Sequence, residues 1–271
     1  MTFRDTFLHV LSKYKDYPLI FSGGVDSSTI LFGLLELKDH KDIRAYNFRY
    51  GNTVSKDNIY AKRICDKFDV KLKFVDVPSD LETTIQDIKL VYSKTHKLLK
   101  THIQVGIPFM YLCERIHDDG FDHAITGLGA DTILGTSKNA CIQYHKNGNQ
   151  GFYQYRLKDS LNPNSSELSC IKIAKFYGIN LCNIYRDSKI SEFLLSKTFD
   201  EIHKPRQKQI LLDLFPNIWK ENDFYRTNSN LQIASGIRDN HKKLLDSEIN
   251  KNHRISEIKL YQDIIKDSED W

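Results

Sequence analysis

The sequence predicts an α/β fold in which a parallel sheet carries helices on both faces, followed by a mainly helical C-terminal part. Two observations lead to this prediction. From residue 17 to about residue 135, short apolar stretches typical of strands alternate with longer helical patterns, as in successive β-α-β units. Beyond about residue 150 the pattern is mostly helical. We therefore expect an α/β core over residues 1–150 and a helical part over 151–271.

Each element is assigned from its own residues. The expected strands are 17–22, 43–48, 71–77, 122–126 and 180–185. The expected helices are 1–16, 27–37, a segment in which Ala61, Ile64, Cys65 and Phe68 recur at helical spacing, and one with Pro108 in its first turn. The polar stretch 136–163 is expected to be a loop or lid, and the last thirty residues a charged, solvated helix.

Composition and charge bound the class of protein. The chain has 271 residues, of which 40% are hydrophobic and 27% charged, and its formal net charge is +4. Its apolar runs are too short to span a bilayer, and its first residues lack the apolar core of a signal peptide. We expect a cytoplasmic protein that does not enter a membrane. The mild positive charge suits a polyanionic nucleotide and does not by itself indicate nucleic acid.

The cysteines do not form a recognisable metal or redox motif. There are five, an odd number, and no C-x-x-C pair occurs among them: Cys65, Cys113, Cys141, Cys170 and Cys182. We expect buried or incidental thiols.

The stretch SGGVDSS, Ser22 to Ser28, stands where a buried strand passes into a helix. Ligands of parallel sheets bind at the carboxyl ends of strands, and a glycine turn before a helix N-terminus exposes backbone N–H groups to anions. Gly23 and Gly24 would let the backbone approach phosphate, and Ser22, Ser27 and Ser28 add hydroxyl donors. Asp26 would repel phosphate unless it holds a bridging Mg²⁺. The stretch therefore predicts a phosphate site with a metal ion.

Neither G-x-x-x-x-G-K-[ST] nor G-x-G-x-x-G is present. SGGVDSS instead resembles the PP-loop of the ATP pyrophosphatase superfamily, whose domains have the adenine nucleotide alpha-hydrolase-like fold. The resemblance implies that ATP is cleaved between its α- and β-phosphates with release of pyrophosphate. The adenylyl group would go to a carboxylate or a carbonyl oxygen. ATP and Mg²⁺ are the cofactors that the resemblance implies.

A second stretch, ITGLGADTILG from Ile125 to Gly135, resembles the T/S-G-E-G-S-D-E-x-x-G-G motif of the asparagine synthetase C-terminal domain. By this resemblance Asp131 shares the Mg²⁺ with Asp26, and Thr126 and Gly127 lie beside the nucleotide. The adenine is expected against the end of the second strand, near Asn47 and Phe48.

A third stretch, Asn180 to Pro216, is similar to the R-V-P-F-L-D … K-x-x-L-R segment of the same family. Asp187 falls on its aspartate, and Lys208 on the lysine that contacts pyrophosphate and the transferring phosphate. Both are expected to be catalytic, with Lys204 as an alternative lysine. A looser match places Arg226 on the arginine of an R-x-K segment, where Asn228 replaces the lysine.

Two departures from the family pattern concern the second half of the reaction. Thr2 stands where family members with a glutaminase domain have the nucleophilic cysteine, so we expect no glutaminase in this chain. Nitrogen would then come from ammonia, an amine or a separate glutaminase subunit. Leu128 replaces the glutamate that assists the attacking amine, and Thr132 replaces the next acid. The sequence does not choose a substitute base among Tyr111, Glu114, His123 and the 136–163 stretch.

The favoured function is an ATP-dependent ligase that adenylates a small-molecule carboxylate and forms an amide with ammonia or an amine. One alternative is a PP-loop enzyme that modifies nucleic acid or a nucleobase with the same ATP chemistry. Another is a nucleotide-binding protein without turnover. Nucleic acid as a partner and a homo-oligomeric state are both left open.

Overall fold

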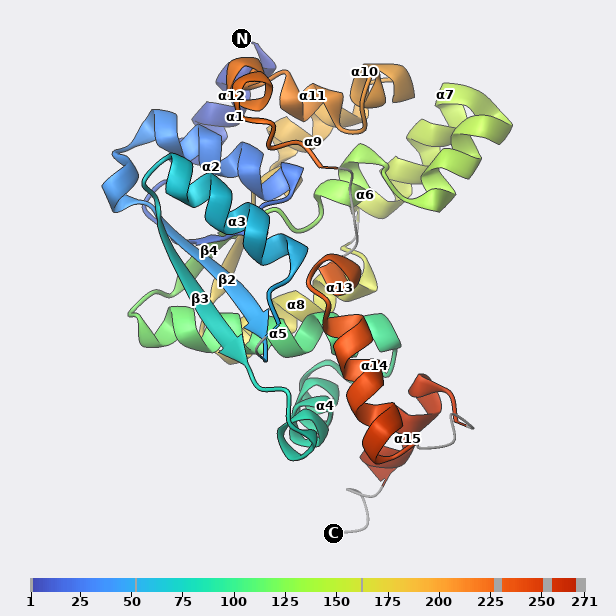
Figure 1. Cartoon of the computed structure of the whole chain (residues 1–271). Coiled ribbons are helices and arrows are strands. Elements are labelled where there is room, and N and C mark those ends of the chain that lie inside the picture. Colours follow the sequence, from blue (N-terminus) through green and yellow to red (C-terminus); the bar gives the residue numbers. More distant parts are fainter. Residues whose placement is uncertain (1, 52, 162, 227–230, 251–254, 267–271) are drawn as a thin grey trace.

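A five-stranded, all-parallel sheet forms the centre of the protein, in the order β3-β2-β1-β4-β5 (Figure 1). The computed structural model describes residues 2–51, 53–161, 163–226, 231–250 and 255–266. The strands are β1 Leu19–Ile20, β2 Arg44–Tyr50, β3 Lys71–Val77, β4 His123–Thr126 and β5 Asn180–Asn183. The predicted α/β class is confirmed. Each expected strand is present, β3 with the same bounds, β1, β4 and β5 with shorter ones, and β2 extended to Tyr50.

The order of the strands reverses at β1. The chain builds β1, β2 and β3 in one direction and then returns to place β4 and β5 on the other side. Ile20 pairs with Tyr46 on one side and with Thr126 on the other. The carboxyl ends of β1 and β4 are therefore neighbours at the switch point, where parallel sheets bind ligands.

Helices cover both faces of the sheet (Figure 1). On one face lie α1 Phe3–Ser12, α2 Val25–Leu37 and α3 Lys56–Lys67. On the other face lie α4 Leu81–Thr95, α5 Lys100–Asp118 and α8 Ser165–Phe176. Adjacent residues of a strand point to opposite faces of the sheet. Ala45 packs in the core on the face of α1, α2 and α3, and Tyr46 packs in the core on the face of α4, α5 and α8. This alternation is the period of an extended strand, and it explains why β2 buries apolar side chains on both faces.

The expected loop at 136–163 is wrong, because these residues form α7, Lys138–Leu161, after the short α6, Ala130–Leu134. The helix is interrupted at Gly148, whose φ is 61°. Its polar outer face hid the helical pattern. Its inner face carries Phe152 and a fully buried Arg156 that donates to four carbonyls, those of Ile133, Leu194, Leu195 and Lys197. This one guanidinium ties α7 to the end of α6 and to the C-terminal end of α9, Ser188–Leu195.

The expected position of Pro108 is also wrong. Pro108 lies inside α5, which begins eight residues earlier at Lys100. The first half of α5 packs closely on α4, since a Cβ added to Gly106 would come within 2.7 Å of a Val91 methyl. Tertiary packing of this half outweighs the missing N–H of one proline.

The C-terminal segments pack on the body of the protein. The remaining elements are η1 His40–Asp42, η2 Ile184–Arg186, α10 Phe199–His203, α11 Gln209–Leu212, α12 Pro216–Asn222, α13 Leu231–Ala234, α14 Ile237–Glu248 and α15 Glu257–Lys266. The expectation of a solvated final helix is wrong for α15, which buries Leu260, Tyr261 and Ile264. Of its charged residues, Lys259 and Lys266 are exposed, whereas Glu257 accepts hydrogen bonds from Gln104 and Tyr261.

β5 extends the sheet although it lies beyond residue 150. The division of the chain into two parts near that residue stays a prediction. The five cysteines are free, and Cys65, Cys113 and Cys170 are buried. Among the described helices, none has the length and apolar character needed to cross a membrane.

Candidate active site

Hydrogen bonds within the turn after β1, and its close packing on α3, fix the conformation of this turn. Gly23 has a φ of +70°, and a Cβ there would lie 2.5 Å from the Ala61 nitrogen on α3. The Ser22 hydroxyl accepts the Gly24 N–H at 3.2 Å and lies 3.1 Å from the Ser27 hydroxyl. The expected hydroxyl donors Ser22 and Ser27 thus brace the turn. Ser28 Oγ is buried without a hydrogen-bond partner. Only glycine suits position 23, because both its conformation and the passing helix exclude a side chain.

The turn after β4 packs directly on the turn after β1. A Cβ on Gly127 would lie 3.2 Å from Asp26 Cβ and 3.3 Å from the Ser27 nitrogen. Thr126 is buried, and its hydroxyl accepts the Leu128 N–H at 3.1 Å. This bond fixes the path of the chain toward α6, which presents Asp131 in its first turn. Two distant stretches of the sequence therefore meet at the switch point of the sheet.

Lys208 joins these two turns. Its ammonium donates to both carboxylate oxygens of Asp26, at 2.8 and 2.6 Å, and lies 2.7 Å from Asp131 Oδ1. Lys208 is only 1% exposed and precedes α11 with a φ of +63°. The alternative Lys204 instead pairs with Asp200 on an exposed turn of the same region. We call Asp26, Asp131 and Lys208 the carboxylate–lysine triad.

Burial and the neighbouring charges together shift the pKa values of Asp26 and Lys208. Burial raises the pKa of Asp26 to about 6, although Lys208 counteracts this shift. Burial alone would lower the pKa of Lys208, but the two carboxylates outweigh it and raise that pKa. The triad brings one ammonium and two carboxyl groups into contact. Asp131 remains 53% exposed on its side chain and opens the triad to solvent.

Arg226 lies over the same turn. It pairs with the buried Asp57, and its Nη2 reaches the Ser22 carbonyl at 3.4 Å. The same Nη2 would lie 3.5 Å from a Cβ on Gly24, and the buried Nε has no hydrogen-bond partner. A guanidinium with a free buried N–H beside a glycine turn is suited to bind phosphate. Asn228, the other residue of this match, lies outside the described residues.

Sequence reasoning missed two residues that shape the site. Asp57 stands in the first turn of α3, just beyond the carboxyl end of β2, and its position at this edge was the available signal. The hydroxyl of Tyr185 donates to the Asp26 carbonyl at 2.9 Å. Tyr185 is fully buried and was hidden inside an apolar stretch.

Asn47 and Phe48, predicted beside the adenine, are both buried, at 3% and 7% exposure. The Asn47 amide donates to the Phe21 carbonyl at 2.7 Å and accepts from the Asn58 amide at 2.9 Å. It thereby connects β1, β2 and α3 near the triad. These bonds occupy the Asn47 side chain within the protein.

Asp187 makes its described contacts outside the triad. It caps α9, where its carboxylate accepts the Lys189 N–H at 3.0 Å, and it lies 4.0 Å from the Lys13 ammonium. None of its described contacts is with Asp26, Asp131 or Lys208. Its predicted catalytic role therefore rests on the sequence match alone.

The candidate bases lie away from the switch point. His123 begins β4, whereas Thr126 ends it, and the His123 ring stacks on Tyr17 at 4.5 Å. Tyr111 donates to Asp87 across the α4–α5 contact, at 3.1 and 3.2 Å. Glu114 lies one turn farther along α5, toward Asp118 at its end. Leu128 itself packs on the apolar core of α5 and α8.

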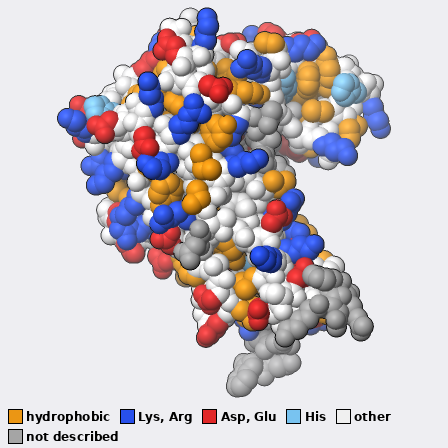
Figure 2. All heavy atoms as spheres, in the orientation of Figure 1, with side chains coloured by type: hydrophobic (Ala, Val, Ile, Leu, Met, Phe, Trp, Pro, Cys, Tyr) orange, Lys and Arg blue, Asp and Glu red, His pale blue; other side chains and the backbone are white. Residues whose placement is uncertain are grey.

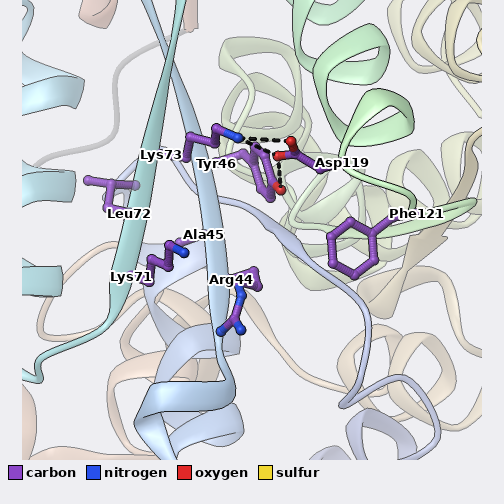
Figure 3. Close-up of a pocket in the computed structure, with 8 residues that line it drawn as sticks. All are labelled: Arg44, Ala45, Tyr46, Lys71, Leu72, Lys73, Asp119 and Phe121. Atoms are coloured by element: carbon purple, nitrogen blue, oxygen red, sulfur yellow. Dashed lines mark hydrogen bonds and ion pairs between the residues drawn. The ribbon is translucent and has the colours of Figure 1, made fainter.

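Two cavities lie at opposite edges of the sheet. One, of about 560 Å³, is at the carboxyl ends of β2 and β3, on the edge that carries the triad; Arg49, Gly51, Val54 and Ser79 are among its lining residues. The other, of about 440 Å³, is at the amino ends of the same strands (Figure 3). There Tyr46 and Lys73 both donate to Asp119, at 2.6 and 2.7 Å. Only the first cavity shares an edge with the triad.

The chain resembles known proteins at two levels. Three 7-cyano-7-deazaguanine synthases match short segments: 37% identity over 65 residues in Colwellia psychrerythraea, 39% over 59 in Pseudoalteromonas atlantica and 36% over 58 in Hahella chejuensis. These segments span 21–24% of this chain and 24–29% of the relatives, so the chain matches about a quarter of their length.

A family model described as asparagine synthase matches residues 11–203, which is more than half of the chain. The match includes both turns at the switch point, with Asp26 and Asp131, and ends at His203, before Lys208. These similarities support the ATP-using chemistry of PP-loop proteins. The chain belongs to the asparagine synthase family.

Proposed function

We propose that the protein is an ATP-dependent ligase that adenylates a carboxylate, releases pyrophosphate and passes the acyl group to ammonia or an amine. The convergence of Lys208 on Asp26 and Asp131 carries the proposal. A buried ammonium beside two carboxylates at a phosphate-type turn is suited to a reaction that separates pyrophosphate from adenylate. The family match over residues 11–203 supports the same chemistry.

The residues divide the task. The backbone of Gly23 and Gly24, the N-terminus of α2 and the guanidinium of Arg226 would bind the phosphates. Asp26 and Asp131, which already converge on one cation, fit Mg²⁺, which commonly takes one or two carboxylates together with phosphate oxygens. When bound, that ion would neutralise charge on the phosphates. The nucleoside would use the cavity at the carboxyl ends of β2 and β3.

Lys208 would act on the leaving group. Its ammonium lies within the triad and stays protonated, because the two carboxylates raise its pKa. A fixed, desolvated cation stabilises negative charge that develops on the phosphates as the carboxylate attacks the α-phosphorus. Such a contact is commonly worth about 10²–10³ in rate.

The nitrogen donor is ammonia, an amine or the product of a separate glutaminase subunit. Leu128 offers no proton acceptor, since its side chain packs on apolar residues and its N–H is bonded to Thr126. We propose that the attacking amine is one that loses its proton without help from this position. An amine of low pKa, or free ammonia delivered in neutral form, meets that condition.

Pyrophosphate release from Mg·ATP is the measurement, across a panel of carboxylic acids with and without ammonia or amines. Release that depends on one acid, and amide that forms only with an amine, would support the proposal. Asp26→Ala and Asp131→Ala should abolish release. Asp200→Ala, which removes an exposed carboxylate paired with Lys204, is the matched control and should leave release intact. Turnover retained in both triad variants would refute the assignment.

The predicted catalytic role of Asp187 has its own variant. Asp187→Asn retains an acceptor for the Lys189 N–H, so it changes the charge and keeps the cap. Loss of release in this variant at unchanged stability supports a catalytic charge, and normal release refutes it.

A second candidate is chemistry on a nucleobase, favoured by the similarity to three 7-cyano-7-deazaguanine synthases. A deazapurine that bears a carboxyl group therefore belongs in the panel. Release with this compound alone would select the second candidate. On the face in Figure 2, Lys and Arg side chains are interspersed with Asp and Glu over α2 and α3, so this face does not favour a nucleic-acid partner. ATP binding without release on any acid would indicate a nucleotide-binding protein.

A further inference from the structure

We infer that His203 is a positioning residue that sets Lys208 against the carboxylates of the triad. This inference rests on the proposed function and assigns a role to a side chain that none of the matched motif positions includes. His203 is the last residue of α10 and is 8% exposed. It contacts Lys208 through the backbone and does not touch the reacting groups.

Both ring nitrogens of His203 are engaged. Nδ1 accepts the Lys208 backbone N–H at 3.2 Å, and Nε2 lies 2.9 Å from the Leu134 carbonyl. A carbonyl only accepts, so Nε2 carries the proton and Nδ1 is the acceptor. Leu134 ends α6, the helix whose first turn presents Asp131. One imidazole thus connects the helix of Asp131 to the turn of Lys208.

The ring stays neutral in this setting. Burial lowers the pKa of His203 to about 4, and the cations of Lys208 and Arg156 act in the same direction. Phe152 and Phe199 contact the ring, with centroids at 6.1 and 4.8 Å. A protonated Nδ1 could not accept the Lys208 N–H. The bond to Lys208 therefore persists across the neutral range.

The backbone of Lys208 explains why an anchor is needed. Its φ of +63° is unfavourable for a residue with a side chain. Because Lys208 precedes α11, its backbone N–H lies outside that helix, and His203 Nδ1 accepts it. Without that acceptor a buried donor is unsatisfied, and the turn can relax to a more common conformation. The ammonium would then leave the position that both carboxylates share.

Two substitutions separate the two bonds. His203→Asn retains an acceptor at the place of Nδ1, and His203→Gln retains a donor at the place of Nε2. We expect His203→Gln to lower kcat for pyrophosphate release by about ten- to a hundredfold, with KM for ATP nearly unchanged, because a small displacement of a catalytic group has effects of this size. His203→Asn should retain most of kcat.

His241→Asn is the matched control. His241 is also buried, and burial also lowers its pKa to about 4. Its Nδ1 lies 2.9 Å from the Tyr261 hydroxyl. It should lose stability and retain kcat per folded molecule. A purely structural role of His203 would make all three variants alike in kcat per folded molecule, and this result would overturn the inference.

Hydrogen exchange of the Lys208 amide gives a readout that needs no turnover. We expect slow exchange in the wild type and in His203→Asn, and exchange faster by at least tenfold in His203→Gln. If the wild type releases no pyrophosphate, the proposed function fails, but this exchange pattern still tests the anchor. Equal exchange in both variants would overturn the inference even in an active enzyme.

Discussion

The ammonium of Lys208 lies 2.6 Å from Asp26 Oδ2, although 182 positions separate the two residues in the chain. Asp26 opens α2 directly after β1, and Lys208 precedes α11 in the C-terminal part. The bond therefore joins the first motif of the sequence to the third. Asp131, from the turn after β4, completes the same ionic contact.

Replacement of Lys208 should abolish activity at the chemical step. Lys208→Ala is expected to lower pyrophosphate release by about 10²–10³, because a fixed donor at the developing charge is lost. Asp26 would then take up a proton more readily, since its counter-charge is gone. Steady-state release is the measurement. Lys204→Ala, which removes the exposed lysine of the same region, is the control and should behave as the wild type; equal losses would show that position 208 is not special.

The ionisation of Asp26 should make stability depend on pH. Its pKa in the folded protein, about 6, is above the value of 3.8 in an unfolded chain. Between these values the folded state binds more protons, so the contribution of Asp26 to the free energy of unfolding falls as pH rises from about 4 to about 6. Above that window it is constant.

Urea unfolding of the wild type and Asp26→Asn at intervals from pH 4 to pH 7.5 isolates this term. The difference in free energy between the two proteins should change with that sign and only in that window. A difference that is flat, or that rises with pH, would contradict the raised pKa. Titrating groups that do not contact Asp26, His203 among them, contribute to both proteins alike.

Gly23→Ala should destabilise the protein more than Gly148→Ala. Both glycines have positive φ, at +70° and +61°. A Cβ at position 23 meets the α3 backbone at 2.5 Å, whereas nothing lies within 4 Å at position 148. Gly148 has a ψ of −155°, a conformation that is essentially restricted to glycine, so the second substitution reports only backbone strain, about 1–3 kcal/mol. We expect Gly23→Ala to exceed it and to weaken ATP binding, measured by thermal unfolding and calorimetry. Equal effects would mean that α3 moves aside.

The ion pair between Asp57 and Arg226 should separate stability from nucleotide binding. Arg226→Met leaves a buried carboxylate unpaired, which typically costs about 3–5 kcal/mol. The double variant Asp57→Leu/Arg226→Met replaces the pair with apolar groups and should regain most of that stability. Affinity for Mg·ATP should stay low in both, because the phosphate contact is lost. Recovery of affinity in the double variant would show that Arg226 serves only the fold.

The sequence predicted the sheet well and the C-terminal part less well. The strands and the two glycine turns are local patterns. A short run of apolar residues followed directly by glycines indicates a strand that ends in a turn. The polar surface of α7 concealed a helix whose stability comes from Phe152 and Arg156. Pro108 suggested a helix start, but the contact of Gly106 with Val91 extends α5 past it. These errors occur where packing outweighs local preference.

The sequence by itself determined the α/β class, the turn of Gly23 and Gly24, and the carboxylates of Asp26 and Asp131, because each follows from residues adjacent in the chain. Only the tertiary structure decided that Lys208, and not Lys204, reaches those carboxylates. It also decided that Asp57 pairs with Arg226, that the Tyr185 hydroxyl donates to the Asp26 carbonyl, and that the Asp187 carboxylate caps α9. The physical reason is that these contacts join segments that lie far apart in the chain. No local pattern encodes which of two neighbouring lysines the fold will bury.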